Sequence, residues 1–313
     1  MDKLIETILR AMLCNARQCW EQGIAAMAAK ELGDEALLLA LCHDMVVRQN
    51  KDGRLCTVED TITVTDPALG ILPMLEAAQL TGDAFYGDAA ARNIAYLVDG
   101  APRGATGIFF HLMDRAEIWA DSAAMTPAPL VRAGQKALGL LQMDGIRKAL
   151  FLPETGLYAH KWDAAHGVYA NKSAWATGNG WIAMGAAWLL IELGKDDPDA
   201  ARCLADFTAH AEAMLRYQTP EGLFHNTMDD PDTFVDCAGA TMLAYSMALL
   251  VEAGFLDDSW LDYPRKVWAA LPGRVNARGY FEDCPGSPYF DKRGPSTEMQ
   301  AFALMLGAVL KRI

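Results

Sequence analysis

The sequence has no long uninterrupted apolar stretch, and this absence excludes several classes of protein. No run of about 18 apolar residues occurs, so we expect no transmembrane helix. The N-terminal segment MDKLIETILRAMLCNARQCWEQG mixes charged residues with apolar ones at helical spacing, and it lacks the apolar core of a secretory signal. We therefore expect a cytoplasmic protein that has no membrane partner.

Cysteine pairs, basic charge and common cofactor motifs are also missing. The seven cysteines are scattered and form no C-x-x-C pair, so we expect reduced thiols without disulfides. No two histidines lie four residues apart, and no G-x-S-x-G, G-x-G-x-x-G or P-loop motif occurs, so we expect neither a metal nor a cofactor. The net charge of −13 argues against nucleic acid as a partner.

Apolar residues at helical spacing, in contrast, run through most of the chain. Hydrophobic residues make up 52% of the 313 residues, and we expect one catalytic domain over residues 1–313. Gly or Asp-Pro divides the periodic segments into helix pairs. The pairs include 68–82 with 84–100, 180–195 with 199–218, and 238–254 with 259–271. Only residues 54–66 alternate as a strand would.

Glycine-centred turns recur along the chain about every fifty residues, which indicates an array of similar units. They lie at Gly53, Gly107, Gly156, Gly222 and Gly279, and an aromatic residue follows each of the last four within two positions. Together with the helix pairs, this period predicts about six helical hairpins.

Several of the predicted helices are apolar around most of their circumference, so they must be buried on two sides. An open solenoid of hairpins is one possible arrangement, but a closed ring explains the two-sided burial better. We predict an all-α fold, an α6/α6 toroid with a central funnel. Its inner helices should begin near residues 68, 122, 179, 239 and 297, and the aromatic turns should line the mouth of the funnel, which is a suitable ligand site.

The side chains near these turns suit a sugar, because aromatic faces stack on its C–H groups and short polar groups bind its hydroxyls. The candidates are the imidazoles of His111, His160 and His225, the indoles of Trp119, Trp175 and Trp181, and the carboxylates of Asp66 and Asp121.

Asp121 is the one acid in the segment WADSAAM, and two interpretations compete for it. It is either an N-cap of the helix that begins with SAAM, or a proton donor whose pKa is raised by apolar and aromatic neighbours. A tryptophan two residues before it and a methionine four residues after it favour the second interpretation, because a cap needs neither.

Five segments lie along the chain in an order that is typical of one enzyme group. They are TDPALGILPMLEAAQLTGD (65–83), EIWADSAAMTPAPLV (117–131), GLYAHKWD (156–163), AWATGNGWIAMG (174–185) and GLFHNTMDDPDTFVDCAGATMLAYSM (222–247). The middle three resemble the W-x-D-x-x-x-M-x-P-x-L, Y-x-H-x-W-D and W-x-R-G-N-G-W segments of the unsaturated uronyl hydrolases, glycoside hydrolase families 88 and 105. The resemblance covers roughly residues 60–300 and implies an α6/α6 barrel.

This resemblance implies a reaction on oligosaccharides that polysaccharide lyases have produced. Enzymes of these families protonate the C4=C5 double bond of a terminal unsaturated uronic acid and add water at C5. Asp121 matches their general acid/base, and Asp66 lies near a second carboxylate. The implied substrate-binding residues are His111, Trp119, Met125, His160, Trp175, Thr177, Asn179, Trp181 and His225.

Thr177 departs from the family pattern, which has arginine at this position, and Asp236 stands where glutamate is usual. Since a guanidinium pairs with a uronate carboxylate, another positive group should replace the arginine if the substrate carries that carboxylate. The sequence offers Arg115, Arg293, Lys172 or the helix N-terminus at residues 178–181.

Two further interpretations remain open at this stage. A sugar epimerase on the same toroid would use two histidines that face each other across the funnel. A carbohydrate-binding homologue without catalytic activity would account for the absence of arginine at Thr177. The fold by itself does not choose among these functions.

Overall fold

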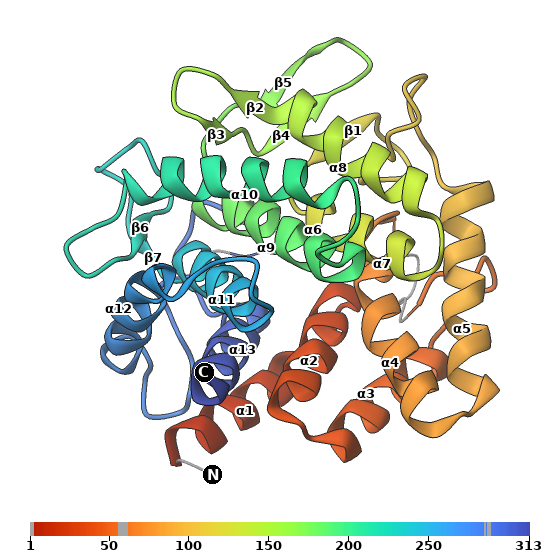
Figure 1. The fold of residues 1–313 in the computed structure, drawn as a ribbon, viewed down its shortest axis with the longest axis horizontal. Helices are drawn as coiled ribbons and strands as arrows, with labels where there is room; N and C mark the ends of the chain where they lie inside the picture. Colours follow the sequence, from red (N-terminus) through yellow and green to blue (C-terminus); the bar gives the residue numbers. More distant parts are fainter. Residues whose placement is uncertain (1–2, 56–61, 285, 287–288) are drawn as a thin grey trace.

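A computed structural model describes residues 3–55, 62–284, 286 and 289–313, and in it helices form an outer and an inner ring (Figure 1). The outer helices are α1 (Lys3–Asn15), α3 (Glu35–Val47), α5 (Ala84–Ala95), α8 (Lys136–Leu150), α10 (Ala200–Leu215) and α12 (Asp262–Ala270). The inner helices are α2 (Cys19–Leu32), α4 (Ile71–Thr81), α6 (Ser122–Met125) with α7 (Pro127–Arg132), α9 (Ala176–Leu193), α11 (Ala238–Glu252) and α13 (Thr297–Arg312). The 3-10 turn η1 (Asp66–Gly70) leads directly into α4.

The inner helices pack against one another in sequence order, and the last packs against the first. Contacts run from α2 to η1 and α4, then to α6 and α7, to α9, to α11, to α13 and back to α2. Each outer helix packs against the inner helix that follows it or precedes it in the chain. This arrangement confirms the predicted all-α fold of six hairpins, and the inner helices begin within a few residues of the five predicted positions.

Small residues let the inner helices approach closely. All of residues 176–190 in α9 and all of residues 238–250 in α11 are buried, as the two-sided burial predicted. A Cβ on Gly180 would lie 3.0 Å from the Cα of Gly239, and one on Gly239 would lie 2.3 Å from the carbonyl oxygen of Ala176. Glycine is therefore required where α9 crosses α11, because any larger residue would push the helices apart.

The five glycine turns share one conformation, and four of them share one kind of anchor. Each glycine has a positive φ, between 76° and 100°, and the residue two positions later is buried. In four turns a buried amide side chain accepts a hydrogen bond from the backbone N–H of that residue. The pairs are Leu55 with Asn93, Phe109 with Gln142, Tyr158 with Asn179, and Phe281 with Gln300. The turn aromatics thus lie in the core, and the expectation that they line the funnel was wrong.

Short antiparallel strands form small sheets in the segments that connect helices. The largest sheet has the order β1–β4–β5 and comprises β1 (Glu117–Trp119), β4 (Lys161–Asp163) and β5 (Val168–Asn171). Two pairs of two-residue strands accompany it: β2 (Phe151–Leu152) with β3 (Leu157–Tyr158), and β6 (Phe224–His225) with β7 (Val235–Asp236). In the segment predicted as a strand, residues 56–61 lie outside the described residues, and Thr63 forms an isolated bridge to Leu112.

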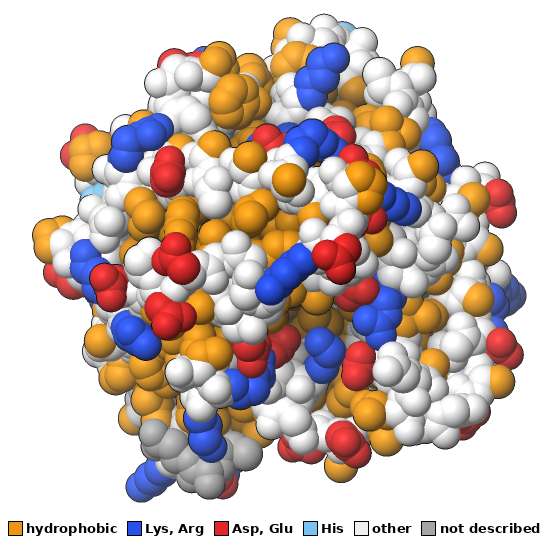
Figure 2. All heavy atoms as spheres, viewed as in Figure 1, with side chains coloured by type: hydrophobic (Ala, Val, Ile, Leu, Met, Phe, Trp, Pro, Cys, Tyr) orange, Lys and Arg blue, Asp and Glu red, His pale blue; other side chains and the backbone are white. Residues whose placement is uncertain are grey.

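Within the described part of the chain, none of the helices combines the length and the apolar character that a membrane crossing requires. Figure 2 shows basic and acidic side chains interspersed over the face seen in Figure 1, so no large patch of one charge covers the described residues there.

Candidate active site

The N-terminal ends of the inner helices converge on a cavity of about 430 Å³. Five of them contribute lining residues at or next to their first turn: Trp20 from α2, Asp66 from η1, Asp121 before α6, Thr177 from α9 and Glu298 from α13. Helix N-termini carry partial positive charge, so this arrangement favours an anionic ligand. The cavity is large enough for one sugar ring and part of a second.

Asp121 occupies the N-cap position of α6, but its side chain makes no capping hydrogen bond. The N-cap interpretation is therefore wrong for this carboxyl group. Its Oδ2 is buried without a hydrogen-bond partner, and His160 Nε2 lies 4.0 Å from it. Burial raises the pKa of Asp121 to about 6, although the positive charge of Lys161 partly opposes that rise. A carboxyl group in this state can both donate and accept a proton near neutral pH.

Asp66 is the second carboxyl group in the cavity, and it interacts with Asp121 electrostatically. Burial and the charge of Asp121 raise the pKa of Asp66 well above its ordinary value. His111 Nε2 lies 3.5 Å from Asp66 Oδ1, and Nδ1 of the same ring lies 2.8 Å from the hydroxyl of Thr65. Since burial lowers the pKa of His111 to about 3, its imidazole is neutral and directs Nε2 toward Asp66.

Unpaired polar atoms gather around these carboxyl groups. Asp66 Oδ1, Asp121 Oδ2, His160 Nε2 and Trp175 Nε1 are buried, and none has a hydrogen-bond partner within the protein. Buried polar atoms are nearly always hydrogen-bonded, so a cluster of exceptions indicates groups that await a ligand. Asp66, Asp121 and Trp175 line the cavity, and their unpaired oxygens and indole nitrogen match the mixed donors and acceptors of a sugar.

Trp119 lines the cavity, yet both faces of its indole are already covered. The His111 ring stacks on it with centroids 4.2 Å apart and planes 11° apart, and Lys161 Nζ lies 3.5 Å from its centroid. These two groups must occupy opposite faces, because on one face they would overlap. The expected stacking of a sugar on Trp119 is therefore not available in this structure, and the indole offers a ligand only its edge.

The other predicted site residues divide into two groups. Met125, Thr177, Trp175 and Trp181 line the cavity. His160, Asn179 and His225 are not among its lining residues. The Asn179 side chain binds the backbone of Tyr158 and Trp175, and His225 Nδ1 lies 2.7 Å from the carbonyl oxygen of Thr233. These bonds give both side chains a role in the fold.

Thr177 is tied to the acid that the sequence places at the start of α11. Its hydroxyl donates a 2.7 Å hydrogen bond to Asp236 Oδ2, and the backbone N–H of Ala238 donates to Asp236 Oδ1. Burial raises the pKa of Asp236 to about 6. The position that carries arginine in the family motif thus holds a neutral group engaged with its neighbour.

Several residues that were not predicted from the sequence also line the cavity. Among them are Lys161, Trp20, Phe290 and Glu298. Trp20 and Glu298 come from opposite ends of the chain, and the closure of the ring brings them together. Trp20 Nε1 donates a 2.6 Å hydrogen bond to Glu298 Oε1, and burial raises the pKa of Glu298 to about 7.

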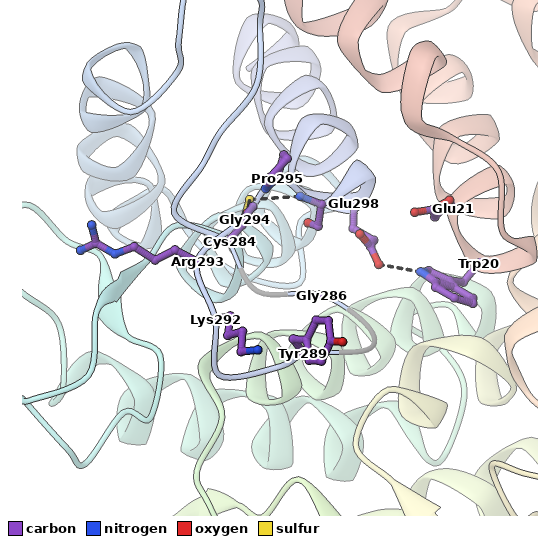
Figure 3. A pocket seen from close by; sticks show the side chains of 11 residues that line it. Trp20, Glu21, Cys284, Gly286, Tyr289, Lys292, Arg293, Gly294, Pro295 and Glu298 are labelled. Carbon is purple, nitrogen blue, oxygen red and sulfur yellow. Dashed lines mark hydrogen bonds between the residues drawn. The ribbon is translucent and has the colours of Figure 1, made fainter.

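A smaller cavity of about 250 Å³ adjoins the first and shares Trp20, Gly286, Ser296 and Glu298 with it. Figure 3 shows Lys292 and Tyr289 on one side of this space and the Trp20–Glu298 hydrogen bond on the other. Arg293 extends away from that bond, and its Nε lies 3.5 Å from Asp283. Across the described residues, no three His, Cys, Asp or Glu side chains are placed to hold a metal ion.

The sequence is similar to those of known hydrolases. Residues 15–302 match the family model Glycosyl Hydrolase Family 88. The unsaturated rhamnogalacturonyl hydrolase YesR of Bacillus subtilis (strain 168) is 28% identical over 214 residues, which cover 64% of this chain and 60% of that protein. The unsaturated 3S-rhamnoglycuronyl hydrolase of Alteromonas sp. (strain LOR) is 26% identical over 188 residues, 53% of this chain and 46% of that protein. The aligned regions thus span less than two thirds of either relative.

The fold is similar to that of a solved structure described as a possible member of the GH105 family, from Salmonella enterica subsp. enterica serovar Paratyphi A str. ATCC 9150. The two superpose with a TM-score of 0.85 at 16% identity, over 99% of this chain and 93% of the other. At this identity the similarity concerns the fold.

Proposed function

Because the chain belongs to glycosyl hydrolase family 88, we propose that it removes the 4,5-unsaturated uronyl residue which polysaccharide lyases leave on their oligosaccharide products. The names of the two curated relatives support this substrate class. The observation that carries the proposal is the buried carboxyl group of Asp121, whose Oδ2 has no hydrogen-bond partner, beside a second carboxyl group in a cavity sized for a sugar.

In the proposed mechanism, the carboxyl group of Asp121 transfers its proton to C4 of the double bond. The resulting positive charge is shared between C5 and the ring oxygen. Water then adds to C5 and gives a proton to the Asp121 carboxylate, which restores the acid. The hemiketal opens by cleavage of the bond between C5 and the ring oxygen, and the hemiacetal left at C1 collapses to an aldehyde and releases the shortened oligosaccharide.

Asp66 has a different part in this scheme, because burial and the charge of Asp121 raise its pKa well above its ordinary value. Its protonated form is therefore favoured, and we assign the acceptance of the proton from water to Asp121. A neutral carboxyl group can donate a hydrogen bond to the attacking water or to a sugar hydroxyl.

We favour hydrolysis over epimerisation because His111 and His160 each face a carboxyl group. His111 is directed toward Asp66 and His160 toward Asp121, so the two imidazoles are not placed as an acid and a base on either side of a ligand. We favour catalysis over simple binding because a sugar-binding site has no need for a carboxyl group with a raised pKa.

A panel of lyase-generated oligosaccharides tests the proposal directly. The conjugated double bond of the terminal unsaturated uronate absorbs in the near ultraviolet, and hydration removes that absorbance. We expect the purified protein to remove it from at least one member of the panel, with a matching release of the shortened oligosaccharide. Persistence of the absorbance across glucuronic and galacturonic substrates would overturn the proposed function.

The pH dependence follows from the need for a protonated acid. Since the pKa of Asp121 is about 6 in the free enzyme, kcat/KM should be level at low pH and fall about tenfold per unit as the pH rises above 6. The measurement is initial rate at limiting substrate from about pH 5 to about pH 9. A profile that stays level through pH 8 would mean that the acid has a much higher pKa, and Asp66 would then be the better candidate.

A further inference from the structure

We infer that Lys161 binds the carboxylate of the substrate, in place of the arginine that position 177 lacks; this inference rests on the proposed function. Lys161 lines the cavity with its Nζ 3.5 Å from the centroid of Trp119 and 4.5 Å from that of Phe290. Within the described part of the chain these rings are its close contacts, and no carboxylate forms an ion pair with it. An ammonium group held by two rings keeps its remaining donors for a ligand.

The position of Lys161 relative to Asp121 fits the chemistry of the substrate. In an unsaturated uronate, C4 and the carboxyl carbon are both bonded to C5, so the proton donor and the carboxylate anchor must lie near each other. The strand register places Lys161 opposite Trp119, two residues before Asp121. The charges of Lys161 and Asp121 affect each other, since each shifts the pKa of the other.

The cations expected from the sequence are placed less well for this role. Lys172 pairs with Glu154 at 3.0 Å and is not among the lining residues, and Arg293 lies near Asp283. Arg115 does line the cavity, but 59% of its side chain is exposed and its Nε is 3.7 Å from Asp114. An anchor at the cavity wall, shielded from water, binds a carboxylate more strongly than an exposed one.

Binding of the substrate carboxylate to Lys161 would also favour the protonated form of Asp121. In the free enzyme the charge of Lys161 lowers the pKa of Asp121, whereas desolvation lowers the pKa of Lys161 itself. A substrate carboxylate paired with Lys161 neutralises that charge, so the pKa of Asp121 rises and its carboxyl group holds its proton. Substrate binding therefore favours the protonated form of Asp121, which the reaction requires.

The test compares Lys161→Gln with the wild type on one unsaturated disaccharide, supplied as the free acid and as its C6 methyl ester. The ester keeps the double bond but has no charge, and both forms are followed by loss of near-ultraviolet absorbance. We expect kcat/KM for the acid to fall about 10- to 100-fold, the range of a hydrogen bond to a charged group, mainly through KM. For the ester, kcat/KM should change less than about threefold. The alkaline limb of the variant's pH profile should move to higher pH.

The control variant is Lys172→Gln, which removes the same charge outside the cavity and should leave both rates and the pH profile unchanged. The ratio of kcat/KM for the acid to kcat/KM for the ester is measured on one sample. Partial unfolding lowers both values alike and leaves this ratio unchanged. An unchanged ratio in Lys161→Gln, or the same altered ratio in Lys172→Gln, would overturn the assignment of Lys161. A wild-type protein that hydrolyses neither form of any panel member would instead overturn the proposed function, and this assignment with it.

Discussion

Asp121→Asn should lower kcat by at least about 10²–10⁴-fold while leaving the fold intact, because this is the range that general acid–base groups contribute. Asparagine keeps the shape of the side chain but cannot deliver a proton to carbon. The native carboxyl group makes no capping bond to α6, and its Oδ2 has no hydrogen-bond partner, so its replacement removes no cap from that helix. Turnover and thermal unfolding measured on the same sample separate chemistry from stability.

Asp66→Asn is the matched control, since it changes another buried aspartate in the same cavity. If Asp66 is protonated at working pH, a neutral amide resembles its native state, and the loss of kcat should be smaller than for Asp121→Asn. The pH profile of Asp66→Asn should still fall above about 6. The reverse order, with Asp66→Asn inactive and Asp121→Asn active, would make Asp66 the proton donor.

The sequence predicts the frame of this molecule well because the frame depends on local, periodic requirements. A glycine with positive φ and a buried residue two positions later recur in every turn, and helices that are apolar all round must be enclosed. The sequence pattern did not show which buried amide side chains bind the backbone of these turns. Asn93 and Gln142 lie tens of residues from the turns they bind, at no fixed spacing. The turn aromatics were consequently assigned to the funnel instead of the core.

Asp66 and Asp121 could be predicted because each begins an inner helix within a recognisable motif. Lys161 could not, because it occupies the variable position of the segment Y-x-H-x-W-D, and only the pairing of β1 with β4 sets it against Trp119. Trp20 and Glu298 were missed for a related reason, as 278 positions separate them and only ring closure joins them. His225 was assigned by analogy between turns, but its ring is bonded to Thr233.

The position of Asp121 depends on a close contact at Gly185, a residue that does not stand out among the glycines of the sequence. Gly185 of α9 faces α6, and a Cβ there would lie 2.1 Å from the carbonyl oxygen of Ala123 and 2.7 Å from the backbone nitrogen of Ala124. Both atoms belong to the backbone of the short helix that follows Asp121 directly, so no flexible side chain can move aside. Gly185→Ala must therefore displace α6 or separate it from α9.

We expect Gly185→Ala to lower the free energy of unfolding by about 3 kcal/mol, at the upper end of overpacking effects, since the clash involves backbone. Displacement of Asp121 by about 1 Å should also reduce kcat about 10²-fold, because proton transfer requires close alignment with C4. Gly87→Ala provides the control in the interior of α5, where the new Cβ would meet only the Cβ of Ala78 at 3.8 Å. It should raise stability by about 0.5–1 kcal/mol and leave kcat unchanged. Calorimetry and turnover on both variants decide the matter: if Gly185→Ala is as stable and as active as Gly87→Ala, the contact between α9 and α6 does not position the acid.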